Sequence, residues 1–267
     1  MKVVRTIAEV REELEPLRAN SIGLVATMGA LHEGHMSLCH AARAECETVV
    51  MSIFVNPAQF GDDADLASYP RDEARDLQFL RTNAEEDSGV EDVDVVFIPS
   101  AEEMYPPGFQ TWVDVTELGS VLEGKFRPGH FRGVATVVLK LLSIVDPNIA
   151  YFGRKDAQQV EVIRQMVRDL ALDVEIRSIP TVRDADGLAL SSRNAGLTAE
   201  ERRRATSLFR ALQTHDASRA RTVLAEAGLE PDYIEIIDSD GRKLLAGAVR
   251  VGSTRLIDNV VLKGDHT

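Results

Sequence analysis

The chain has 267 residues, enough to bury a substantial core as one large domain or two smaller ones. Its 43 acidic and 30 basic side chains give a formal net charge of −13, which disfavours nucleic acid and anionic membranes as partners. No apolar stretch approaches the roughly 20 residues of a membrane span. Residues 1–15 carry the charges of an ordinary helix rather than of a signal peptide, so a cytoplasmic protein is expected.

Apolar runs rich in β-branched residues predict buried strands, and segments between them have helical periodicity. The strands are predicted at residues 22–26, 48–55, 93–98, 149–152 and 174–179, and the helices at residues 36–45, 134–145 and 160–170. Strands that alternate with helices imply right-handed crossovers. The sequence therefore predicts an α/β fold with a doubly wound parallel, Rossmann-like sheet, whose ligands bind at the carboxyl ends of the strands.

The only two cysteines, Cys39 and Cys46, lie seven residues apart in a predicted helix. At about 1.5 Å per residue they are too far apart for a disulfide, so reduced structural thiols are expected. Further along, Pro106-Pro107-Gly108 breaks the pattern before a short strand predicted around residues 112–115.

The pattern changes after about residue 182. Thr198 and Glu201 match a capping box that opens a helix to about Leu212, and a second helix ends near Gly228. Strands are then predicted at residues 233–237 and 248–262, with a turn at residues 238–241. We therefore expect a Rossmann-like domain over residues 1–182 and a smaller C-terminal α+β cap domain over residues 183–267.

The most informative segment, Thr-Met-Gly-Ala-Leu-His-Glu-Gly-His at residues 27–35, directly follows the predicted buried strand at residues 22–26. A glycine turn from strand to helix with two imidazoles is suited to nucleotide phosphates, because the helix amides and each histidine donate toward negative charge. A zinc site is the competing interpretation. The metalloprotease pattern needs histidines four apart, whereas His32 and His35 are three apart with Gly34 between them.

Three further segments contain candidate binding residues. Asn56 and Gln59 follow the second strand and have neutral donors and acceptors suited to a hydroxy acid and an amine. Residues 127–133 gather His130, Arg132 and another arginine at a tight turn, although solvated arginines at a helix start fit equally well. After the strand at 149–152, Lys155 reaches phosphate as a compact cation, and the aspartate that follows it caps the helix or holds a ribose.

A fourth segment, residues 186–194, lies at the predicted domain junction. Ser191, Ser192 and Arg193 supply two hydroxyls and a cation that can fold over a leaving pyrophosphate. A serine-rich hinge is the alternative.

Residues 32–35 resemble the His-x-Gly-His signature of the nucleotidyltransferase superfamily. The longer string at residues 27–35 is similar to that of the pantothenate synthetase (pantoate–β-alanine ligase) family, and residues 56–59, 152–159 and 186–194 match the same family in the same order. The resemblance is strong over the first 195 residues and weak over the cap. The chain departs from the family at Arg154, where glutamate is usual, and at Ala26, where proline is favoured.

The resemblance implies ATP-dependent condensation of (R)-pantoate with β-alanine through a pantoyl adenylate, in a homodimer that uses Mg²⁺. Its implied catalytic residues are His32, His35, Lys155 and Arg193. Implied ATP contacts are Met28, Gly29, Ala30, Leu31, His32, Glu33, Gly34, His35, Gly153, Arg154, Lys155, Asp156, Val182, Leu190, Ser191, Ser192 and Arg193. Asn56, Gln59, Arg132 and Gln159 are the implied substrate contacts, and Asp76 is the implied metal ligand.

Three other functions are considered. A nucleotidyltransferase acting on a phosphorylated acceptor would need more cations than Asn56, Gln59 and Gln159 provide. A tRNA synthetase fragment is disfavoured by the charge of −13 and the missing anticodon domain. A catalytically silent nucleotide sensor has little need for the histidine pair, Lys155 and the 191–193 loop together.

Overall fold

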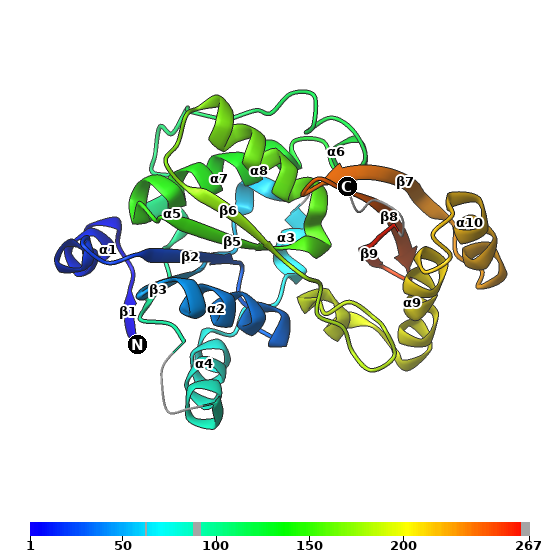
Figure 1. Ribbon diagram of the computed structural model, residues 1–267, viewed down its shortest axis with the longest axis horizontal. Helices are drawn as coiled ribbons and strands as arrows, with labels where there is room; N and C mark the ends of the chain where they lie inside the picture. The colour runs from blue at the N-terminus through cyan, green and yellow to red at the C-terminus, as the bar shows by residue number, and fades with distance from the viewer. Residues whose placement is uncertain (62, 88–91, 263–267) are drawn as a thin grey trace. The chain divides into compact units, whose positions relative to one another are not determined.

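The computed structural model describes residues 1–61, 63–87 and 92–262 (Figure 1). The chain divides into two compact units. The first unit comprises residues 1–152 and 162–179, and the second comprises residues 153–161 and 180–267. Residues 153–161 therefore group with the C-terminal part of the chain, which the sequence does not reveal.

The first unit is built on a six-stranded parallel sheet with the order β1-β4-β3-β2-β5-β6. The strands are β1 (Lys2–Val4), β2 (Ile22–Thr27), β3 (Thr48–Ile53), β4 (Val95–Phe97), β5 (Ile149–Gly153) and β6 (Glu175–Ile179). The chain runs from β2 to β3 and β4 on one side, then resumes at β5 on the other side of β2. This confirms the predicted doubly wound sheet and places the reversal of strand order, where such folds bind ligands, between β2 and β5.

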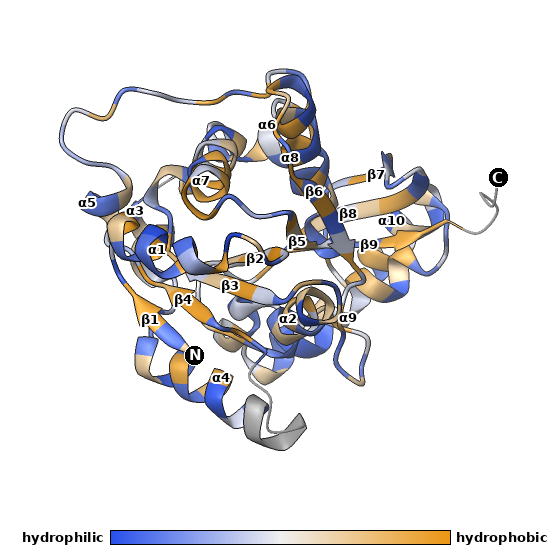
Figure 2. Ribbon diagram, turned by 60° about the vertical axis from the view of Figure 1, so that its left-hand side comes forward, coloured by the Kyte–Doolittle hydropathy of each residue, from blue (hydrophilic) through white to orange (hydrophobic). Residues whose placement is uncertain are grey.

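Helices flank this sheet. They are α1 (Ile7–Leu14), α2 (Glu33–Glu45), α3 (Asp63–Ser68), α4 (Glu73–Asp87), α5 (Ala101–Met104), α6 (Glu123–Phe126), α7 (His130–Val145) and α8 (Ala157–Asp169), which passes from the second unit into the first. Helices α2 and α4 lie on one face and α7 on the other (Figures 1 and 2). Within the described part of the chain, no helix is both long and apolar enough to cross a membrane.

The inner strands β2 and β3 form the core because most of their side chains are apolar and nearly all are buried. All six residues of β3 are buried, as are five of the six in β2. The apolar colour of β2 and β3 is visible in Figure 2. Cys39 and Cys46 belong to this core as free, buried thiols, as predicted.

The second unit contains a three-stranded antiparallel sheet and two helices, which confirms the predicted α+β character. The helices are α9 (Ala199–Leu212) and α10 (Ala217–Glu226), and the strands are β7 (Pro231–Ser239), β8 (Arg242–Val251) and β9 (Thr254–Val261). The predicted capping box is present, since Thr198 accepts from the Glu201 amide and Glu201 accepts from the Thr198 amide. Leu208, Leu212 and Leu245 pack in its separate apolar core.

Three local predictions are wrong. Residues 2–4 form edge strand β1 instead of helix. Residues 112–115 form no strand, and the Val113 amide donates to the Thr136 hydroxyl at 3.0 Å. The strand predicted over 248–262 is the end of β8 and all of β9, separated by a turn in which Gly252 has a φ of +58°. A two-residue turn inside an apolar run is hard to detect from periodicity alone.

Candidate active site

The turn between β2 and α2 has an unusual backbone. Gly29 and Ala30 both have positive φ angles, +77° and +49°. A Cβ atom at Gly29 would lie 2.8 Å from Asp76 Oδ2, so a larger residue does not fit there. Left-handed backbone at a non-glycine residue such as Ala30 costs free energy and persists only where its surroundings hold it, which is common at ligand-binding turns.

Asp76, in the first turn of α4, holds this turn. Its Oδ2 accepts from the Ala30 amide and its Oδ1 from the Leu31 amide, both at 2.8 Å, and the residue is 2% exposed. Asp76 thus positions this turn, and its role as a metal ligand stays a prediction. Within the described ranges, no group of three or more His, Cys, Asp or Glu side chains could hold a metal ion.

The two histidines form a reciprocal cap at the start of α2. His32 Nδ1 accepts from the Gly34 amide at 3.1 Å, and His35 Nδ1 accepts from the His32 amide at 3.3 Å. Their rings stack with centroids 4.1 Å apart. Because each Nδ1 is an acceptor, the hydrogen of each neutral ring must lie on Nε2. The helix start therefore combines the positive end of the helix dipole with two imidazole N–H donors, which suits an anionic phosphate.

Asn56 and Gln59 lie together after β3, at the 3₁₀ turn η2 (Pro57–Gln59). Asn56 Nδ2 donates to Gln59 Oε1 at 3.0 Å, and Asn56 Oδ1 accepts from the Tyr105 hydroxyl at 2.8 Å. Gln59 Nε2 contacts the Met28 sulfur at 3.2 Å. The structure therefore brings the amide pair, Asn56 and Gln59, against the predicted phosphate turn at residues 27–35.

Helix α7 supports the amide pair from behind. Gly133 approaches so closely that a Cβ there would lie 2.2 Å from the Ala58 carbonyl oxygen, and the Gly133 carbonyl accepts from Asn56 Nδ2 at 3.2 Å. Buried His130 places Nδ1 2.9 Å from the Gln59 carbonyl oxygen. A carbonyl only accepts, so Nδ1 carries the hydrogen. His130 thus fixes the backbone that carries Gln59.

Arg132, a predicted substrate contact, interacts with Asp114 and Trp112. Its Nε lies 3.4 Å from Asp114 Oδ2, and its guanidinium carbon lies 5.2 Å from the centre of the Trp112 ring. Its side chain is 46% exposed. These contacts connect Arg132 with residues 112–114 instead of with the amide pair, so its substrate role stays a prediction.

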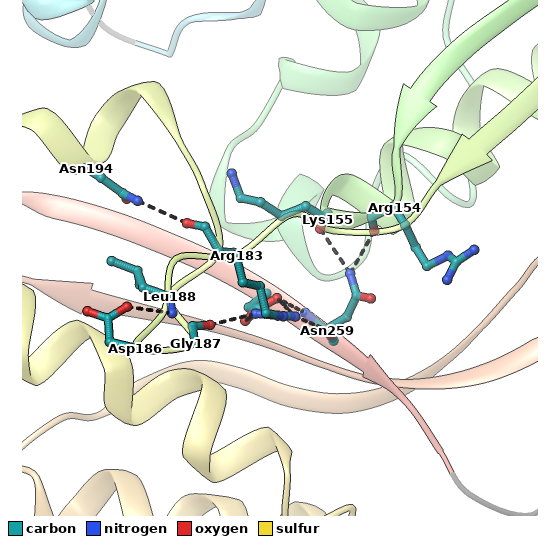
Figure 3. A network of polar contacts seen from close by, with 10 residues as sticks. Arg154, Lys155, Arg183, Asp186, Gly187, Leu188, Asn194 and Asn259 are labelled. Atoms are coloured by element: carbon teal, nitrogen blue, oxygen red, sulfur yellow. Dashed lines mark hydrogen bonds and ion pairs between the residues drawn. The ribbon is translucent and has the colours of Figure 1, made fainter. Parts of the chain in front are cut away.

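In the second unit, Lys155 lies on the 3₁₀ turn η3 (Arg154–Asp156), which follows β5 and leads into α8. Asn259 Nδ2 donates to the carbonyl oxygens of Arg154 and Lys155, at 2.8 and 3.1 Å (Figure 3). The Lys155 ammonium points away from this contact in Figure 3. Gly153, Asp156 and Gln159 are half-buried on the same short segment.

The predicted 191–193 loop begins beside a small hairpin. The Leu190 amide donates to the Val182 carbonyl at 3.0 Å, and Arg183 pairs with Ala189 as an antiparallel bridge. Ser191 then caps the turn η4 (Ser192–Gly196), with its hydroxyl accepting from the Arg193 amide at 3.3 Å. Val182, Leu190 and the 191–193 loop are therefore brought together within the second unit.

The family model described as pantoate-beta-alanine ligase matches residues 2–261. The chain belongs to the pantoate–β-alanine ligase family.

Relatives and solved structures agree along the whole chain. The pantothenate synthetase of Roseiflexus castenholzii is 51% identical over 286 residues, covering 98% of this chain and 100% of the relative. That of Moorella thermoacetica is also 51% identical, over 288 residues, covering 98% and 99%. The crystal structure of pantothenate synthetase from Thermus thermophilus has a TM-score of 0.89 at 42% identity, covering 99% of this chain and 100% of that one.

A second solved structure was obtained with ligands. The pantoate-beta-alanine ligase of Francisella tularensis, complexed with beta-gamma ATP and beta-alanine, has a TM-score of 0.87 at 37% identity, covering 100% of both chains. The predicted family and fold class are therefore confirmed. The roles of individual site residues stay predictions.

Sequence reasoning missed several residues that position this family's motifs here. Tyr105 bonds to Asn56, and Arg183, Asp258 and Asn259 support the second-unit segments. Among these residues, only the Asp258-Asn259 dipeptide has a sequence pattern that could have indicated its role. These two adjacent polar residues interrupt the apolar run of residues 256–261 and are both 4% exposed, and buried polar groups of this kind require partners.

Proposed function

We propose that the chain catalyses the ATP-dependent condensation of (R)-pantoate with β-alanine to pantothenate, AMP and pyrophosphate. The observation that carries this proposal is the contact of Gln59 Nε2 with Met28 at 3.2 Å. It joins a neutral amide pair, suited to a hydroxy acid, to a turn suited to nucleotide phosphates. A phosphorylated acceptor would call for cations where Asn56 and Gln59 provide amides.

The reaction proceeds in two steps. The pantoate carboxylate attacks the α-phosphorus of ATP and pyrophosphate leaves, and the β-alanine amine then attacks the carbonyl carbon of pantoyl adenylate and AMP leaves. The Nε2–H groups of His32 and His35 donate to the phosphoryl oxygens as charge grows on them, and the positive end of the α2 dipole adds to this stabilisation. Positioning and charge stabilisation suffice, so no covalent enzyme intermediate is expected.

The second unit supplies cations for the phosphates. Lys155 and Arg193 interact with the negative charge of the triphosphate and of the departing pyrophosphate. Gly153, Arg154, Asp156, Val182, Leu190, Ser191 and Ser192 complete the proposed ATP contacts of this unit. Gln159, on the first turn of α8, is a further proposed pantoate contact.

Magnesium is proposed to arrive with ATP, where it neutralises phosphate charge, and Asp76 is the proposed protein ligand for it. A homodimer is also proposed from the family, and the exposed apolar side chains of Trp112, Val121 and Phe126 are consistent with it. A cytoplasmic location fits the two buried, unpaired cysteines.

The test uses pantoate labelled with ¹⁸O in its carboxylate, incubated with ATP, Mg²⁺ and β-alanine and analysed by mass spectrometry. An adenylate route transfers one ¹⁸O to AMP, since the acyl carbon–oxygen bond breaks in the second step. Reactions without β-alanine serve as the control and should accumulate pantoyl adenylate. Formation of ADP, or of unlabelled AMP together with pantothenate, would contradict the proposal.

A further inference from the structure

Asn259 of β9 binds the backbone of the turn that carries Lys155. Its Nδ2 atom donates to two successive carbonyls, of Arg154 at 2.8 Å and of Lys155 at 3.1 Å (Figure 3). Both partners can only accept, so the orientation of the amide is unambiguous. With Asn259 only 4% exposed, an amide that lost these partners would remain buried without hydrogen bonds.

Asn259 is itself fixed by a buried ion pair. Arg183 Nη1 and Nη2 lie 2.6 and 2.9 Å from the two oxygens of Asp258, which is 4% exposed. Asp258 Oδ1 also accepts from the Asn259 amide at 2.8 Å, and Arg183 Nη2 donates to the Asn259 carbonyl at 3.1 Å. The backbone of Asn259 is therefore bound at both its N–H and its C=O.

The same arginine binds the segment that leads into the 191–193 loop. Arg183 Nη1 donates to the Gly187 carbonyl at 3.1 Å, and its guanidinium carbon lies 4.0 Å from the centre of the Phe209 ring. Gly187 has a φ of +88°, and a Cβ there would lie 2.4 Å from the Phe209 ring. The hairpin that precedes Ser191 and the turn that carries Lys155 are thus tied to one pair of residues on β9.

We infer that Asn259 is a positioning residue that fixes the direction of Lys155, and that the Arg183–Asp258 pair couples this turn to the loop containing Arg193. The inference rests on the proposed phosphate role of Lys155. A cation stabilises a transition state most when its position needs no reorganisation during the reaction. The antiparallel sheet of the second unit would then contribute directly to adenylation instead of serving only as a cap.

The test is single-turnover formation of pantoyl adenylate by the full-length Asn259→Ala enzyme. We expect the rate to fall about 10- to 100-fold, the effect typical of a small misplacement of a reacting group. Asp232→Asn is the matched control. It disrupts the ion pair of the same sheet in which Arg255 Nε lies 2.7 Å from Asp232 Oδ2. Because residues 154–155 keep all their partners, the rate should stay within about twofold of wild type.

A double-mutant cycle with Lys155→Ala separates this inference from the proposed function. If Asn259 acts through Lys155, then Asn259→Ala has less than about a twofold further effect in the Lys155→Ala enzyme. Equal losses in both backgrounds, or a wild-type rate in Asn259→Ala, would overturn the inference. A wild-type rate in Lys155→Ala would instead refute the role of the lysine.

Asn259→Ser provides a milder substitution should the alanine variant not fold. Its shorter hydroxyl has a single hydrogen to donate, so we expect an adenylation rate between those of the wild-type and Asn259→Ala enzymes. The thermal unfolding midpoint of the serine variant should equal that of the Asp232→Asn control. A folded serine variant with the wild-type rate would also overturn the inference.

Discussion

Asp76 and Ala30 are joined by a hydrogen bond of 2.8 Å from the Ala30 amide to Oδ2, at a residue whose φ is +49°. A second bond of the same length joins Oδ1 to the Leu31 amide. One buried carboxylate thus stabilises a strained backbone conformation directly before the two histidines proposed to bind phosphate.

Asp76→Asn should lower the free energy of unfolding by about 1–3 kcal/mol, because its NH₂ group would face one of the two amides and leave a buried donor unsatisfied. Pantoyl adenylate formation should slow as well. Denaturant unfolding and single-turnover kinetics measure the two effects. Glu73→Gln, on the same helical turn but at an exposed ion pair with Arg5, is the control and should have little effect on either measurement. Recovery of the Asp76→Asn rate at high Mg²⁺ would instead indicate a metal ligand.

His32→Asn separates capping from catalysis. Asparagine caps helices well, so the free energy of unfolding should stay within about 0.5 kcal/mol of wild type, whereas the imidazole Nε2–H donor is lost. Loss of one preorganised donor typically costs about 10²–10³-fold in rate, which single-turnover adenylation measures. His32→Ala, which removes both functions, should additionally lose about 1 kcal/mol of stability. A fast His32→Asn enzyme would show that His32 only caps α2.

Gly133→Ala should disturb the amide pair, because its Cβ would lie 2.2 Å from the Ala58 carbonyl oxygen. Overpacking of this kind costs about 1–3 kcal/mol of stability. The resulting shift of Gln59 should weaken pantoate binding more than ATP binding, as isothermal titration calorimetry can measure. Gly61→Ala is the control, since a Cβ there meets no atom within 4 Å. Equal losses for the two ligands would mean that α7 supports the fold without shaping the pantoate site.

Features specified by local sequence were predictable. The β2 and β3 strands follow from β-branched apolar runs, and the start of α9 follows from the Thr198–Glu201 pair. The phosphate turn was equally visible, since a strand, a glycine and a helix are adjacent there. Three-residue β1 is too short for periodicity to reveal.

The contacts that orient the site were not predictable, because they join distant segments. Asp76 is 46 residues from Ala30, and Asn259 is 105 residues from Arg154. Each is a bond between a side chain and a backbone atom, so its partner has no residue type that a sequence pattern could specify. The positioning role of Asp76 is visible only from its two amide contacts.

Arg193 lies on η4, with its amide bonded to the Ser191 hydroxyl at 3.3 Å. If its guanidinium binds pyrophosphate charge as that charge grows, Arg193→Ala should lower the turnover of adenylation more than it weakens ATP binding in the ground state. The loop should also protect the mixed anhydride from water, so the variant should release AMP in excess of pantothenate. Rapid-quench kinetics and the ratio of the two products measure these effects. Arg203→Ala removes the same charge from an exposed position of α9 and should leave both unchanged. An Arg193→Ala enzyme with normal adenylation and one AMP for each pantothenate would show that this loop is only a linker.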